Sequence, residues 1–130
     1  MNYLSEINFK NIKKVGIRVD FNVPVDNNFV ITDHTRLLRA KETINFVKNK
    51  SCKILLISHF GRPKEDYDKK FSFENLVSQF SKILEMEIDL ISYESFQIHG
   101  LSNFDRFSQV SLLDNIRFFK GEERNDEVFS

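Results

Sequence analysis

A small set of polar residues follows the segments of this chain that have the pattern of β-strands. The carboxyl ends of parallel strands lie at one edge of a sheet, and ligands bind beyond that edge. The residues that would gather there are Asp20, Asn22, Arg36, His59, Gly61, Arg62 and Arg117. Arginine forms paired, charge-assisted hydrogen bonds with phosphate and carboxylate groups. Three arginines, a histidine and a helix N-terminus therefore predict a pocket for a small anion with several negative charges.

Asp20 needs its own explanation, because a carboxylate repels an anionic ligand. Its useful role would be to accept a hydrogen bond from a substrate hydroxyl, with Asn22 donating or accepting beside it. Each residue alone also has a structural interpretation, since Asp-x-Asn often forms a turn after a strand. The functional interpretation depends on the agreement of all these residues on one edge of the sheet.

The segments that would position these residues alternate between strand and helix patterns. Strands are predicted over residues 15–19, 52–57, 88–91 and 110–113, and helices over about 34–48 and 73–84. Thr32 or Asp33 is the expected cap of the first helix, and Ser72 that of the second. No element is predicted over 92–107. This order predicts an α/β fold, a three-layer sandwich around a mostly parallel sheet.

Composition excludes several classes of protein. The 130 residues suit one modest domain, and 19 basic against 19 acidic side chains exclude a strongly cationic nucleic-acid surface. The longest strongly apolar run, 54–57, is far shorter than the roughly 20 residues that a membrane span needs. Cys52 is the single cysteine, so no internal disulfide can form, and a reducing cytoplasm is the expected location.

The last residues resemble the beginning of an element. Asn125 or Asp126 has the character of a helix cap, with Glu127 in the first turn, yet the sequence stops at Ser130. One turn is not a stable helix in water. We therefore expect this chain to be the front part of a longer protein.

Four segments resemble signature segments of the amino-terminal domain of the phosphoglycerate kinase family. They are residues 18–24 (RVDFNVP), 31–36 (ITDHTR), 58–63 (SHFGRP) and 112–118 (LLDNIRF). They occur in the family's order, and the resemblance runs from about residue 14 to 129. The family usually has Glu and Leu where this chain has Asp114 and Ile116.

The resemblance implies that residues 1–130 form part of a phosphoglycerate-binding domain, with the carboxy-terminal nucleotide-binding domain absent. The family transfers a phosphoryl group between 1,3-bisphosphoglycerate and ADP, giving 3-phosphoglycerate and ATP, and Mg-ATP or Mg-ADP would bind the absent domain. By the same resemblance, Arg36 stabilises the transferring phosphoryl group and is the catalytic residue. The implied substrate-binding residues are Asp20, Phe21, Asn22, Arg36, His59, Phe60, Gly61, Arg62 and Arg117.

The resemblance also implies a cytoplasmic enzyme that is monomeric at full length and binds neither nucleic acid nor membranes. The 130 residues alone are expected to be inactive. Two alternatives stay open. The chain could be a non-catalytic module that binds an anionic metabolite, or a decayed gene product that does not fold. The argument against decay is the retention of Asp20, Asn22, Arg36, His59, Arg62 and Arg117.

Overall fold

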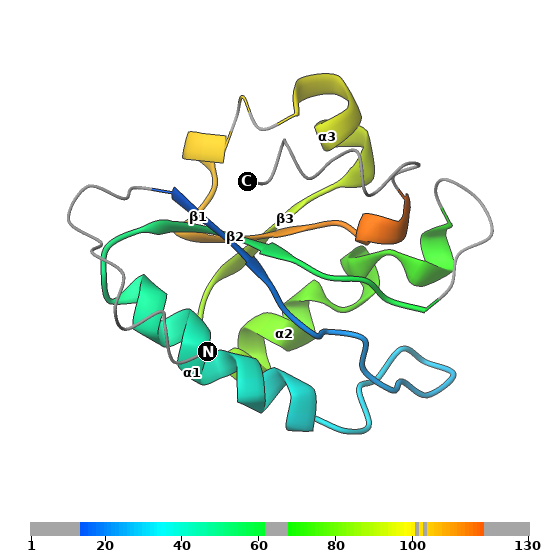
Figure 1. The fold of residues 1–130 in the computed structure, drawn as a ribbon. Helices are drawn as coiled ribbons and strands as arrows, with labels where there is room; N and C mark the ends of the chain where they lie inside the picture. The colour runs from blue at the N-terminus through cyan, green and yellow to red at the C-terminus, as the bar shows by residue number, and fades with distance from the viewer. Residues whose placement is uncertain (1–13, 62–67, 101, 103, 119–130) are drawn as a thin grey trace.

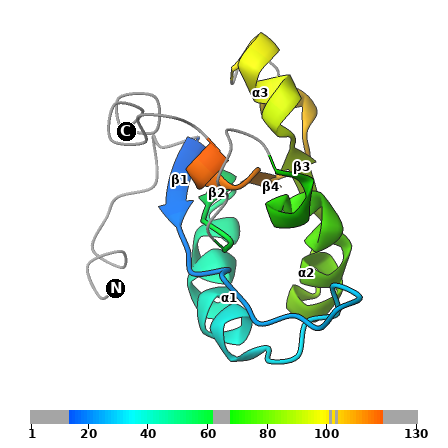
Figure 2. The same ribbon diagram turned by 90° about the vertical axis from the view of Figure 1, so that its right-hand side faces the viewer.

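A parallel sheet forms the centre of the structure, a computed structural model that describes residues 14–61, 68–100, 102 and 104–118. Within these ranges four strands pair in the order β1-β2-β4-β3 (Figure 1; β4 is labelled in Figure 2). Their bounds are β1 Lys14–Arg18, β2 Lys53–Ile57, β3 Ile88–Ile91 and β4 Val110–Leu113. Every pairing is parallel, so all four carboxyl ends lie at the same edge. The predicted α/β class is confirmed, and β3 and β4 have the predicted bounds.

The two central strands, β2 and β4, are covered on both faces. All four residues of β4 are buried, as are the last four of β2. Residues Ile54 and Leu56 of β2 pack in one core, and their neighbours Leu55 and Ile57 pack in a second core on the opposite face. The short apolar run in the sequence predicts this double burial, because a strand inside a parallel sheet has no solvent-facing side.

Helices on both faces complete the three layers. Helices α1 (Thr35–Lys48) and α2 (Val77–Leu84) lie against one face, and α3 (Tyr93–His99) lies on the other (Figures 1 and 2). Helix α1 packs Leu37, Ile44 and Val47 into the first core. Within the described residues, no helix is long and apolar enough to cross a membrane.

The starts of α1 and α2 differ slightly from the sequence prediction. His34, and not the predicted Thr32 or Asp33, holds the cap position of α1, and its side chain makes no capping hydrogen bond. Asp33 lies one residue earlier, and its Oδ1 accepts hydrogen bonds from the Thr35 backbone N–H at 2.9 Å and from the Thr35 hydroxyl at 2.6 Å. Ser72 caps a short 3₁₀ turn, Phe73–Asn75, rather than α2 itself. Helix α2 begins only at Val77, because the backbone of Leu76 interrupts the helical geometry with φ −125°.

Helix α3 corrects the prediction that residues 92–107 form no regular element. Ser92 caps this helix, and its hydroxyl oxygen accepts the Ser95 N–H at 3.1 Å. A 3₁₀ turn, Phe104–Arg106, follows. Helix α3 has seven residues, none of them fully buried, and only Tyr93 and Phe96 pack partly against the second core, so its apolar pattern is too short for sequence analysis to detect. The expected cap near residues 125–127 lies outside the described residues.

We predict that Phe80→Ala strongly destabilises the fold. The Phe80 ring is completely buried and lies 4.9 Å from the Phe21 ring and 5.6 Å from the Phe73 ring, centroid to centroid. Removing a buried phenyl ring costs about 3–5 kcal/mol of unfolding free energy. Urea denaturation measures the change, with Ile98→Ala as the control, because Ile98 is 66% exposed. Equal losses in the two variants would contradict the described core.

Candidate functional site

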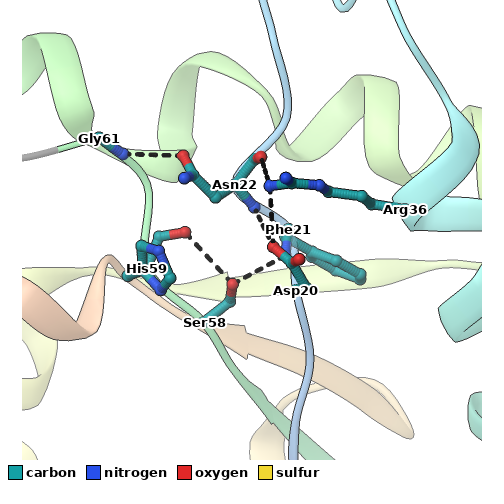
Figure 3. Close-up of polar contacts among 7 residues, drawn as sticks. All are labelled: Asp20, Phe21, Asn22, Arg36, Ser58, His59 and Gly61. Carbon is teal, nitrogen blue, oxygen red and sulfur yellow. Dashed lines mark hydrogen bonds and ion pairs between the residues drawn. The ribbon is translucent and has the colours of Figure 1, made fainter.

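The first turn of α1 places Arg36 over the chain that leaves β1 (Figure 3). Its Nη1 donates to the Asn22 carbonyl oxygen at 2.5 Å and to Asp20 Oδ1 at 3.3 Å. The same Oδ1 accepts the Asn22 backbone N–H at 3.3 Å. The side chains of Arg36 and Asp20 are 47% and 60% exposed, so this ion pair is open to solvent and to ligands.

Phe21 fastens this segment to the core between the two polar residues. Its ring is completely buried, and its backbone N–H donates to Ser58 Oγ at 2.9 Å (Figure 3). Phe60 is also buried, with its ring 6.0 Å from that of Phe73. Phe21 and Phe60 were predicted as site residues, and in the structure their rings are buried in the core. Their position leaves only their backbones to face the carboxyl edge.

The loop after β2 is joined to the loop after β1 through Gly61. The Gly61 N–H donates to Asn22 Oδ1 at 3.0 Å (Figure 3). Because the side-chain oxygen of Asn22, Oδ1, accepts this bond, the side-chain amide presents its NH₂ group as the available donor. Gly61 has φ +61°, and a Cβ atom there would lie 2.3 Å from Cδ1 of Phe71. Glycine is therefore required both by the backbone conformation and by the space.

The other predicted residues fall into three groups. His59 is half-buried directly after Ser58. Arg117 has an exposed side chain on a 3₁₀ turn, Ile116–Phe118, which is bonded to the end of β2 because the Ile116 N–H donates to the Ser58 carbonyl at 3.0 Å. Arg62 lies outside the described residues. The structure thus joins Asp20, Asn22, Arg36 and Gly61 directly and puts Arg117 on the same edge.

A cavity of about 280 Å³ between β1 and α1 adds two arginines, Arg18 and Arg39, that were not selected as site residues from the sequence. Its charged lining consists of Arg18, Asp20, Arg36 and Arg39. Arg39 follows Arg36 by three residues on α1, a spacing that puts both on one helix face. This spacing was the available signal for Arg39. Three guanidinium groups and one carboxylate suit an anion.

Asp114 and Asn115, which follow β4, also escaped selection as site residues. Asp114 is 1% exposed, and its carboxylate accepts hydrogen bonds from the Ser72 hydroxyl and from backbone N–H groups of Phe73, Tyr93 and Asn115. Burial raises the pKa of this carboxyl, although these hydrogen bonds oppose the rise. The available signal was position, because Asp114 and Asn115 follow their strand as closely as Asp20 follows β1.

The described donors do not form a metal site. Among these residues, no three or more His, Cys, Asp or Glu side chains are grouped to hold a metal ion. Asp20, the carboxylate of the site, is paired with Arg36. Mg²⁺ needs several free oxygen ligands, so the residues present fit an anionic ligand and not a metal ion.

We predict that Gly61→Ala disrupts the loop more than the strain of its backbone alone would. Gly100 offers the control, because it has φ +56° and an added Cβ would meet none of the described atoms within 4 Å. Positive φ at a non-glycine residue costs about 1–3 kcal/mol, and only Gly61→Ala adds the clash with Phe71. Thermal melting of both variants measures the difference. A Gly100→Ala loss as large as that of Gly61→Ala would contradict a close approach at Gly61.

We also predict that ionisation of Asp114 lowers stability as pH rises. Its pKa is raised above the ordinary 3.8, so the folded chain holds this proton more tightly than the unfolded chain does. This tighter proton binding adds to the free energy of unfolding. The added stability is complete below pH 3.8 and is lost as pH rises through the raised pKa of Asp114. Asp114→Asn should therefore lose less unfolding free energy than the wild type between about pH 4 and pH 7, measured by urea denaturation in steps of about one pH unit. A rise in the unfolding free energy of the wild type relative to that of Asp114→Asn, as pH increases, would contradict this prediction.

Comparison with known proteins identifies the family. The family model of phosphoglycerate kinase matches residues 4–130. The phosphoglycerate kinase of Campylobacter hominis is 40% identical over 98% of this chain, and that of Helicobacter pylori strain J99 is 43% identical over 90% of it. The chain spans 32% and 29% of the length of these relatives.

Solved structures agree. Phosphoglycerate kinase from Coxiella burnetii superposes with a TM-score of 0.72 and 31% identity, over 96% of this chain and 31% of the other. The Pyrococcus horikoshii enzyme gives a TM-score of 0.69 and 25% identity over 90% of this chain and 28% of the other. Since the family model covers nearly every residue, this chain belongs to the phosphoglycerate kinase family.

Proposed function

We propose that this chain is the phosphoglycerate-binding part of a phosphoglycerate kinase. The complete enzyme would transfer a phosphoryl group between 1,3-bisphosphoglycerate and ADP, giving 3-phosphoglycerate and ATP. The observation that carries the proposal is the group formed by Arg36, Asp20 and Asn22, which offers a cation, a carboxylate acceptor and an amide donor at one point. A hydroxylated acid with a phosphate group needs these three partners.

Each residue of the group has a distinct proposed role. Asp20 uses Oδ1 for Arg36 and the Asn22 N–H, and its Oδ2 is proposed to accept a hydrogen bond from the substrate hydroxyl. The side-chain NH₂ of Asn22 donates to the substrate, because the side-chain oxygen, Oδ1, already accepts the Gly61 N–H. Arg36 stabilises charge on the transferring phosphoryl. Phosphoryl transfer depends mainly on alignment and positive charge, which this group can supply.

Anion binding extends along the same edge in the proposed enzyme. Arg117, His59 and Arg62 hold the anionic groups of the substrate, and Arg117 supports this role by its exposed position beside the end of β2. The fixed charge of Arg117 suits a phosphate or carboxylate group. Its turn is bonded to Ser58, which also binds the Phe21 N–H. The anionic groups and the hydroxyl of one substrate are therefore proposed to bind to a single bonded framework.

The nucleotide site is proposed to lie outside residues 1–130, which would form part of one domain. The chain spans about a third of its relatives, and its described residues present an anion site without a metal-binding group. Mg-ATP or Mg-ADP would bind the remaining part of the protein, and closure of the two parts would bring the substrates together. The 130 residues alone are then inactive.

Binding measurements on the 130-residue chain test the proposal. Calorimetric titration with 3-phosphoglycerate should give saturable binding, and Arg36→Ala should weaken it about 10- to 100-fold, the value of one charge-assisted hydrogen bond. Arg106→Ala is the matched control, because this exposed arginine precedes β4 at the opposite edge of the sheet. Absence of binding by a cooperatively melting wild type would overturn the proposal, as would equal effects of the two variants.

Joining the chain to the remaining two thirds of the Campylobacter hominis relative tests the catalytic part. This chimera should convert 3-phosphoglycerate and ATP, and Arg36→Ala should lower its kcat by about 10²- to 10³-fold. The 130-residue chain alone should give no turnover in the same coupled assay. Turnover by the chain alone, or an inactive but folded chimera, would contradict the division of labour proposed here.

A further inference from the structure

Asn115 joins three separate backbone segments behind the candidate site. It is completely buried and comes two residues after the end of β4. Its Nδ2 donates to the Phe60 carbonyl at 2.6 Å and to the Phe71 carbonyl at 3.0 Å. Its Oδ1 accepts the Arg117 N–H at 3.1 Å. Both donors and the acceptor of this amide are therefore used, each by a different segment.

Two of these segments carry candidate ligand-binding groups. The Phe60 carbonyl belongs to the loop between His59 and Gly61, and the Gly61 N–H holds the Asn22 side chain. The Arg117 N–H belongs to the turn that carries the exposed guanidinium group. The planar amide of Asn115 thus fixes the distance between the Gly61 loop and the Arg117 turn. It makes no contact with the solvent-facing edge itself, since it has no exposed surface.

The neighbouring acidic residue has a different set of partners. Asp114 accepts from Ser72, Phe73 and Tyr93, which lie at the starts of the α2 region and of α3. Its bonds fasten the helices to the sheet. Asn115, in contrast, reaches the Phe60 carbonyl in the Gly61 loop. Both residues bind the segment at Phe71 to Phe73, but only Asn115 also reaches the loop that carries Gly61.

We propose that Asn115 is a positioning residue for phosphoglycerate, an inference that rests on the proposed function. It sets the spacing between the Gly61 loop and the Arg117 turn, and it acts through Phe60 and Arg117 without touching the ligand. An aspartate at this place would keep the shape of the side chain but lose both N–H donors, and it would turn carboxylate oxygens toward two carbonyl oxygens. The spacing would then change while the ligand-contacting side chains stay in the sequence.

Gln109 provides a matched control at the opposite edge of the sheet. Its Nε2 also donates to two carbonyl oxygens, those of Lys48 and Cys52, both at 2.9 Å. Asn115→Asp and Gln109→Glu therefore remove the same pair of donor bonds, one near the site and one far from it. We expect Asn115→Asp to weaken 3-phosphoglycerate binding to the chain about tenfold or more, and Gln109→Glu to change it less than about twofold, although both lower the melting temperature.

The chimera with the Campylobacter hominis relative separates positioning from a loss of folded enzyme. Positioning predicts that Asn115→Asp raises KM for 3-phosphoglycerate and leaves KM for ATP unchanged. A purely structural role predicts a fall in kcat with both KM values unchanged, and that result would overturn the inference. If Asn115→Asp does not melt cooperatively, Asn115→Ser, which retains one hydroxyl donor, carries the same test with a smaller rise in KM.

The outcomes also distinguish this inference from the proposed function. A wild-type chain and chimera that do not bind 3-phosphoglycerate would remove the proposed function and the inference with it. Wild-type binding, with Arg36→Ala weakened but Asn115→Asp equal to the wild type, would overturn the inference alone. Equal weakening by Asn115→Asp and Gln109→Glu would assign both residues to stability and would overturn the inference as well.

Discussion

The parallel register of the sheet is the constraint on which the candidate site depends. Strand β2 lies between β1 and β4, with Arg18 paired to Ile57 and Leu56 paired to Leu112. Strands β2 and β4 bury side chains on both faces. A shift of one residue in their pairing would move each side chain to the opposite face of the sheet, and the polar residues that follow the strands would no longer lie where the site needs them. Because the strands are parallel and paired in this register, three loops that are far apart in the sequence begin at the same edge of the sheet.

Hydrogen bonds continue the sheet's order into these loops. The Val19 N–H donates to the Ile57 carbonyl at 2.9 Å, just beyond β1. Ser58 then binds the Phe21 N–H through its hydroxyl and the Ile116 N–H through its carbonyl. The buried rings of Phe21 and Phe60 anchor the loops after β1 and β2 to the core, so the residues on either side of them lie nearer the surface. Alternation of apolar and polar side chains thus persists past the ends of the strands.

Sequence patterns predicted those parts of the fold that apolar spacing controls. The strands at 88–91 and 110–113 and the packed face of α1 follow from such spacing. Helix α3 could not be found in this way, because its formation depends on the Ser92 cap and it buries no residue completely.

The site itself divides in the same manner. Asp20, Asn22 and Arg36 were recognisable because each follows a strand or begins a helix. The role of Asn115 depends on contacts with residues 44 and 55 positions away in the sequence, which no local pattern records. Burial of a polar side chain is a property of the packed structure, and a sequence pattern that scores apolar residues passes over it.

The site combines a fixed neutral framework with exposed charges that are free to change partners. Asn115 bonds the carbonyl and Asn22 the N–H of the Phe60–Gly61 peptide group, and breaking the buried bonds of Asn115 would leave carbonyl and N–H groups without partners. The Asp20–Arg36 pair is about half exposed, and an exposed ion pair contributes little to stability. An anion that takes Arg36 from Asp20 therefore costs the fold little. The arrangement keeps the loops in place while leaving the positive charge available to a ligand.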